Sequence, residues 1–174
     1  YPVELLGRDV SGMKVYRDIA FDNGFIYHFG QLNSLYITKD HISFSQVPLR
    51  IKYDLQFPQG NQDMLLKGFE KYYDYYLQHD ELLNIYFDKY RYCYYLVVRV
   101  RGRGIEKGKD FSMQFMYPKC MIVALDRNLN SMGEFFLPDD KYSCQVMFVT
   151  PDGLYISEDH PNNPDFDEDF MRFR

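Results

Sequence analysis

The sequence predicts a mostly β protein built from small antiparallel sheets. The chain of 174 residues contains 17 Tyr and 15 Phe but no Trp, and such aromatic side chains favour the half-buried surface of a sheet. Short apolar runs alternate with turn sequences through most of the chain, as is typical of antiparallel sheets. Three segments of similar sequence also indicate repeated units. Together these observations predict about three propeller-like blades.

Strands are expected where apolar or aromatic runs end in residues that favour turns. Asp22–Gly24 and Pro151–Gly153 supply residues that tolerate positive φ between paired strands, and Asp126–Asn130 supplies a longer turn. The predicted strands are Val15–Phe21, Phe25–Phe29, Ser34–Thr38, Leu49–Tyr53, Leu82–Phe87, Tyr92–Val100, Cys120–Asp126, Gly133–Leu137, Gln145–Thr150, Gly153–Ser157 and Phe170–Phe173.

One amphipathic helix interrupts this pattern. From Asp63 to Gln78, large apolar side chains recur at three- and four-residue spacings, which is the period of a helix face. Asp63 is available as the N-cap, because a carboxylate accepts hydrogen bonds from the amides of the first turn. We expect the aromatic stripe of this helix, near 63–78, to pack on a sheet, since such stripes more often form a core face than a ligand platform.

A repeat defines the expected blades. Ile19–Gly24, Ile85–Tyr90 and Val146–Gly153 each pass from apolar residues through a Phe into a polar turn. Units of about 60 residues with three or four short strands fit β-propeller blades that carry insertions. Three blades do not close a ring, which typically needs at least about four. The other blades are then expected in an upstream part of the protein or in a second chain, unless the units belong to another β architecture.

Chain length and charge limit the classes of protein. Residues 1–174 are expected to form a single domain, because domains commonly contain about 100–200 residues. The start at Tyr1 and Pro2 lacks both Met and a signal sequence, so we expect a processed or truncated chain. The chain contains no run of about 18 apolar residues, so no transmembrane segment is expected. The net charge of −5 is concentrated between Glu158 and Asp169, and no nucleic-acid partner is expected.

A resemblance rests on four segments, Tyr86–Tyr95 (YFDKYRYCYY), Ala124–Leu129 (ALDRNL), Thr150–Ser157 (TPDGLYIS) and Asn163–Asp169 (NPDFDED). They resemble an uncharacterised family of secreted, Bacteroides-type lipoproteins, over about residues 82–174. The resemblance implies a six-bladed, TolB-like β-propeller of which this chain is the C-terminal half. It also implies a lipidated precursor in the periplasm or on the outer-membrane surface, and it supplies no catalytic residues.

The cysteines and histidines give no metal or redox motif. Cys93, Cys120 and Cys144 each lie in an apolar or aromatic run, and their spacing matches no known motif. Buried free thiols are the first interpretation, and a disulfide between two of them is the alternative. No zinc-type spacing occurs among the histidines, which are His28, His41, His79 and His160.

Two charged segments are the candidate binding sites. Asp165, Asp167 and Asp169 alternate as in the first half of an EF-hand loop, but Phe170 replaces the required Gly, so calcium is a weak candidate beside a solvated acidic bend. A Gly-rich basic segment falls one residue short of a phosphate-binding P-loop and is interpreted as a hairpin loop. Its basic residues are Arg99, Arg101, Arg103, Lys107 and Lys109.

These observations favour a non-catalytic binding or scaffold module without catalytic residues, cofactor or established metal. Exposed Tyr can stack on sugars, and open strand edges can pair with a protein, so the candidate partners are a glycan, an envelope protein or a second copy of the chain. The alternative function is a carbohydrate-active hydrolase or lyase that uses loop carboxylates. A third possibility is a structural role in closing a ring of upstream blades.

Overall fold

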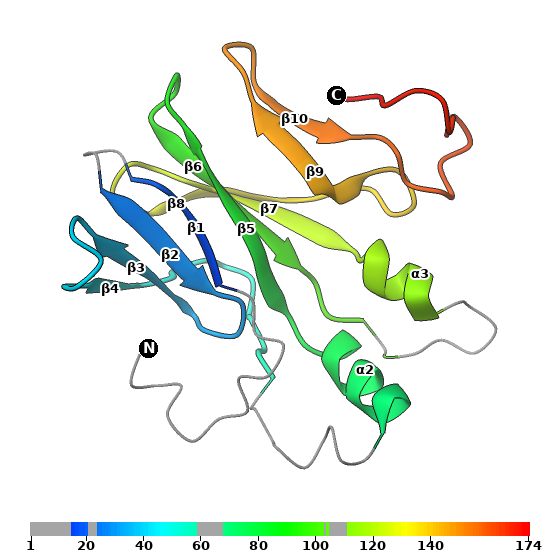
Figure 1. Ribbon diagram of the computed structural model, residues 1–174, viewed down its shortest axis with the longest axis horizontal. Coiled ribbons are helices and arrows are strands. Elements are labelled where there is room, and N and C mark those ends of the chain that lie inside the picture. Colours follow the sequence, from blue (N-terminus) through cyan, green and yellow to red (C-terminus); the bar gives the residue numbers. More distant parts are fainter. Residues whose placement is uncertain (1–14, 21–23, 59–67, 103, 105–110) are drawn as a thin grey trace.

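The computed structural model describes residues 15–20, 24–58, 68–102, 104 and 111–174. Within these ranges the chain forms ten strands in three antiparallel sheets, together with two helices (Figure 1). A mostly β fold with antiparallel sheets is therefore confirmed.

Each sheet is a meander in which consecutive strands are neighbours. The first sheet contains β1 (Val15–Ile19), β2 (Phe25–Phe29), β3 (Ser34–Thr38) and β4 (Ser45–Pro48). The second contains β5 (Glu81–Asp88), β6 (Cys93–Arg99), β7 (Cys120–Leu125) and β8 (Ser131–Phe136). The third contains β9 (Ser143–Val149) and β10 (Leu154–Ser157).

The two central strands of the second sheet, β6 and β7, are buried on both faces. All six residues of β7 are buried, and alternate side chains enter two different hydrophobic clusters. Met121 and Val123 pack with Ile26 of the first sheet, whereas Cys120 and Ile122 pack with Met147 of the third. Two-sided burial explains why β7 reads as a continuous apolar run rather than as an alternating one.

The three sheets approach one another through their first strands. β5 contacts β1 on one side and β9 on the other. The Asp18 carboxylate on β1 accepts a hydrogen bond of 2.7 Å from the backbone N–H of Phe87 on β5. Figure 1 shows the sheets following one another in chain order, with β5 running between the other two.

The predicted strand Leu49–Tyr53 is wrong, because a carboxylate binds the backbone amides at its end. Glu134 on β8 accepts hydrogen bonds from the N–H groups of Lys52 and Tyr53, and buried Asp80 accepts one of 2.6 Å from Gln56. These amides are therefore not available to a ladder. The fourth strand instead lies at Ser45–Pro48, a polar edge segment that ends in Pro, as edge strands tolerate.

The predicted strand Phe170–Phe173 is also wrong. It is reduced to one isolated bridge between Ser157 and Phe173, flanked by paired backbone hydrogen bonds between Ile156 and Arg174. Before Phe173 the chain forms turns rather than a strand, since the Phe170 amide donates a hydrogen bond to the carbonyl of Asp167.

The two helices lie at the same end of the second sheet (Figure 1). Helix α2 (Phe69–Leu77) falls within the expected helix 63–78, of which residues 63–67 lie outside the described ranges, including the predicted N-cap Asp63. Tyr76 is buried, but Phe69 is 74% exposed, so only part of the aromatic stripe packs inward. Helix α3 (Phe111–Met116) was not predicted, because six residues are too few for a periodic signal.

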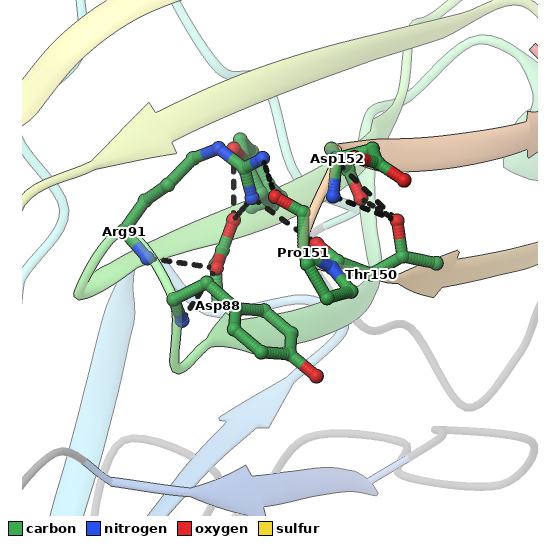
Figure 2. A network of polar contacts seen from close by, with 8 residues as sticks. Asp88, Arg91, Thr150, Pro151 and Asp152 are labelled. Carbon is green, nitrogen blue, oxygen red and sulfur yellow. Dashed lines mark hydrogen bonds and ion pairs between the residues drawn. The ribbon is translucent and has the colours of Figure 1, made fainter.

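A buried carboxylate ties the second sheet to the third. Asp88 is fully buried and accepts hydrogen bonds from the backbone amides of Tyr90 and Arg91 and from the Arg91 side chain. The same guanidinium donates to the carbonyl of Thr150 at 3.2 Å and to that of Pro151 at 2.6 Å. Figure 2 shows Arg91 lying between Asp88 and the turn that joins β9 to β10. Burial opposes ionisation of Asp88, but these hydrogen bonds hold its pKa below the usual value.

Removing this guanidinium should loosen the contact between the two sheets. We expect Arg91→Ala to lower the urea midpoint of unfolding more than Arg127→Ala does, because Arg127 is exposed on another turn and serves as the matched control. Equal midpoints for the two variants would contradict a stabilising role for the network.

Acid should destabilise the fold through His28. This residue on β2 is fully buried, and burial lowers its pKa from 6.5 to about 3. Below pH 6.5 the unfolded chain takes up a proton that the folded chain excludes, so stability is lost as the pH falls, by up to about 1.4 kcal/mol per pH unit. Urea titrations across this range should show a weaker pH dependence of stability for His28→Gln than for the unchanged protein, and Arg127→Gln, at an exposed position that does not titrate here, is the matched control. If the free energy of unfolding changed with pH equally in His28→Gln and in the unchanged protein, His28 would not be a source of the acid destabilisation.

Candidate functional site

A cavity of about 400 Å³ lies at the helical end of the second sheet. Its walls come from the ends of α2 and β6, from α3 and the start of β7, from the connection between β8 and β9, and from residues near His160. Gly104 fits against α2 at this wall with a φ of +88°, where a Cβ atom would come within 2.3 Å of the Asp74 carboxylate. The cavity is thus built by segments that are far apart in the sequence.

Arg99 is a buried cation in the wall of this cavity. The residue is 3% exposed, and its Nη2 donates to the backbone carbonyls of Tyr76 at 3.1 Å and His79 at 3.4 Å. Its Nε lies 3.7 Å from Oε2 of Glu81, and its Cζ lies 4.2 Å from the centre of the Tyr76 ring. Within the described residues, Nη1 and Nε have no hydrogen-bond partner.

Tyr76 and Glu81 contact the Arg99 guanidinium but do not line the cavity. The Tyr76 hydroxyl donates to Glu81, which is itself buried, and burial together with the Glu81 charge raises the pKa of Tyr76. Glu81 and Tyr76 do not line the cavity, whereas Arg99 does. The charge of Arg99 is therefore balanced on the side away from the cavity.

His160 is a second buried polar residue of the site. It is 5% exposed, its Nδ1 accepts a hydrogen bond of 3.1 Å from the Asn162 amide, and its ring meets Tyr117 edge-on. Nε2 lies 3.8 Å from Oδ1 of Asp140. Burial lowers the pKa of His160 in spite of this carboxylate, so the imidazole is neutral at pH 7 and can exchange hydrogen bonds with a ligand.

Carboxylates and an amide form the rim of the cavity. Asp139 pairs with Lys119 at 2.5 Å, and both side chains are mostly exposed. Asp140 accepts a hydrogen bond of 3.0 Å from the Asn162 side chain, with a φ of 59° that Asp tolerates better than most residues. The rim is therefore polar, whereas Arg99 lies in the buried wall.

A disulfide joins Cys120 to Cys144 at the cavity wall. The first interpretation of the cysteines as buried free thiols is wrong for this pair and agrees with the structure for Cys93, which is free and buried. The two residues start β7 and β9, strands of different sheets, and only the packing of those sheets brings them together. Sequence spacing alone carries no such information.

The predicted calcium ligands are not gathered by the fold. Asp165, Asp167 and Asp169 are exposed, and Asp167 accepts a hydrogen bond of 3.0 Å from the Asp169 amide within its own turn. In the described part of the chain, no group of three or more His, Cys, Asp or Glu residues is arranged to hold a metal. Calcium binding by this segment stays a prediction.

Two of the five basic residues of the Gly-rich segment lie within the described ranges, and three lie outside them. Arg99 is buried, and Arg101, whose side chain is 32% exposed, pairs with buried Asp80 at 2.6 Å. Arg103, Lys107 and Lys109 lie outside the described ranges. Of the four histidines, only His160 lines the cavity.

Sequence reasoning missed several residues of the cavity. Tyr117, Asp139, Asp140 and Tyr142 had no distinguishing spacing, because they belong to two connections that meet only in the fold. Arg99 carried no signal either, since it ends the apolar run of β6 and Arg at the end of a strand is seldom buried.

One solved structure has a closely similar fold. A crystal structure of a member of the DUF4221 family from Bacteroides vulgatus superposes with a TM-score of 0.78 and 22% identity, over 92% of this chain and 45% of that chain. No family model and no curated protein matches the sequence. The likeness shows a shared fold, and a Bacteroides family of unknown function agrees with the resemblance drawn from the sequence.

This chain spans less than half the length of that protein. Neither helix in the described ranges is long and apolar enough to cross a bilayer.

The disulfide predicts a simple thiol count. The protein denatured without reductant should present one reactive thiol, that of Cys93, and three after reduction. Reduction should also lower the free energy of unfolding by about 2–4 kcal/mol, the usual contribution of such a cross-link. Three thiols before reduction would restore the interpretation as free cysteines.

Proposed function

We propose that this chain is part of a β-propeller and acts as a non-catalytic binding module of the bacterial cell envelope. The proposal of a propeller is supported by the sheets, which follow one another as meanders and approach through their first strands. It is also supported by the similar structure, whose chain is about twice as long as the matched part. Two such halves would supply the blades needed for a ring.

The ligand that the cavity suits best is a glycan. The observation that carries this proposal is the grouping of Tyr117 and Tyr142 with the polar side chains of Asp140, Asn162 and His160 in one cavity of about 400 Å³. Aromatic rings can stack on sugar faces, and carboxylates, amides and imidazoles exchange hydrogen bonds with sugar hydroxyls. The volume is within the usual range for small-molecule sites, about 300–1,000 Å³.

A binding role is favoured over the alternative hydrolase or lyase. Glycosidases place two carboxyl groups on opposite sides of the scissile bond. Here the cavity carboxylates are neighbours in one connection, and Asp139 is already paired with Lys119. This arrangement suits recognition of hydroxyl groups better than acid–base catalysis.

The envelope location and the other partners follow from the resemblance and the sheet edges. In the described residues, β4 and β8 each pair on one side only, which leaves edges where an envelope protein, upstream blades or a second copy could add a strand. A lipid anchor upstream of Tyr1 would hold the module in the periplasm or on the outer-membrane surface.

Glycan binding predicts retention without cleavage. The protein should bind some members of a panel of immobilised envelope and plant polysaccharides, and Tyr142→Ala should weaken this binding at least tenfold, because the variant loses an aromatic wall of the cavity. Tyr155→Ala, outside the cavity lining, is the matched control. No new reducing ends should appear during incubation. Failure to bind any polysaccharide would contradict the binding role, and new reducing ends would support the hydrolase.

A further inference from the structure

The outer face of the first sheet is apolar and partly exposed. On β2, Ile26 packs towards the second sheet, so Tyr27 and Phe29 lie on the opposite face. Residues directly opposite in an antiparallel pair share a face, and the pairing of β1 with β2 therefore places Val15 and Ile19 on this face too. These two residues are 45% and 56% exposed. The described residues thus leave part of an apolar sheet face open to solvent.

The outer face of the third sheet has the same character. Met147 and Ile156 pack towards the second sheet, so Phe148 and Tyr155, which follow and precede them, lie on the opposite face. The Phe148 ring stacks on that of Tyr155 at 5.5 Å and meets Phe173 edge-on at 4.8 Å. Phe148 is nevertheless 40% exposed. The molecule therefore has an apolar face at each end of its three sheets.

Both outer faces continue an arrangement that already exists inside the molecule. The first sheet packs on one face of the second and the third sheet on the other, with the first strands of the three sheets close together (Figure 1). An exposed apolar face on a folded protein indicates an interaction surface. Because each internal contact joins one sheet face to another, the occupant that suits each outer face is a further sheet of the same kind.

Charge selects which outer faces can meet. Residues 143–174, which contain the third sheet and the segment after it, carry seven carboxylates and two arginines. Residues 15–48, which contain the first sheet, carry three carboxylates and two cations, of which Arg17 is exposed on the outer face. Packing two third sheets together would bring two acidic segments close, which repulsion opposes. The first sheet is therefore the better partner for the third.

We propose that two copies of this chain associate in a two-fold ring, in which the first sheet of each copy packs its outer face on the outer face of the third sheet of the other. The contact is then made twice, and all four outer faces are covered. An open head-to-tail contact between the same faces would instead build filaments. This inference rests on the proposed propeller arrangement and names a second copy as the partner that completes it.

The number of sheets supports a ring of two copies. Two copies would supply six sheets, within the range of about four to eight blades that is typical of propellers. In the similar structure the matched part is 45% of the chain, so the remainder is slightly longer than the matched part. A second copy of this chain has about the length needed to take the place of that remainder.

The mass of the unchanged protein in solution is the first test. Sedimentation velocity and light scattering over a wide range of concentrations should show a species of twice the chain mass of 20.9 kDa and none larger. Retention on immobilised polysaccharides is measured on the same samples, so that association and glycan binding are read separately. The unchanged protein decides whether a dimer forms, even if a variant does not fold.

Variants on the two outer faces locate the contact. Ile19→Lys on the first sheet and Phe148→Asp on the third each place a charge in both contacts of the ring, so each should raise the dissociation constant of the dimer at least about tenfold. Phe135→Asp is the matched control, because Phe135 is 60% exposed but belongs to the second sheet. Its dimer should be as stable as that of the unchanged protein.

The outcomes separate this inference from the proposed function. A dimer that both face variants weaken and Phe135→Asp does not weaken supports the ring. Weakening by only one face variant means that like faces pair, and weakening by neither, or by Phe135→Asp, means that another surface pairs; each of these results overturns the ring. A monomer at every concentration, or filaments, also overturns it. A monomer that binds polysaccharides leaves the binding role standing, whereas a dimer that binds none supports the ring and contradicts that role.

Discussion

Burial of β6 and β7, the central strands of the second sheet, on both faces is the constraint on which the rest of the structure depends. β6 and β7 face the first sheet with one set of side chains and the third sheet with the other, so two cores share one backbone layer. Removing either neighbouring sheet would expose an apolar face. The three sheets therefore stabilise one another, although the first and third join different clusters.

At the ends of these strands, polar backbone groups and charged residues enter the interior and lose their contact with water, which is unfavourable. Asp80 and Asp88 illustrate how hydrogen bonds compensate this loss. Asp80 accepts hydrogen bonds from the amides of Gln56 and Arg101, and Asp88 accepts those of Tyr90 and Arg91. Each carboxylate also pairs with an arginine, so that the buried charge and the loop amides compensate one another. Loops thereby become parts of the core without forming strands.

The binding of loop amides by carboxylates that are distant in sequence explains which parts of the fold the sequence predicts. Strands such as Phe25–Phe29 and Ser34–Thr38 follow from local patterns of apolar residues and turns, because both determinants lie within the segment. Leu49–Tyr53 has an equally good pattern, but Glu134, distant in sequence, accepts hydrogen bonds from the amides of its last two residues. The disulfide and the cavity are harder still to predict, since strands and connections that are distant in sequence build them and no local spacing indicates that they meet.

Arg99 differs from the other buried charges in how many of its polar atoms have hydrogen-bond partners among the described residues. Asp80 and Asp88 each bind both a cation and backbone amides, and each cluster binds together parts of the chain that would otherwise separate. Arg99 is equally buried, yet its guanidinium is only half used by the described residues. An apolar side chain in place of Arg99 would leave the buried Glu81 carboxylate without its cation and the carbonyls of Tyr76 and His79 without this donor. Arg99 therefore joins the end of α2 to the start of β5, where Glu81 lies.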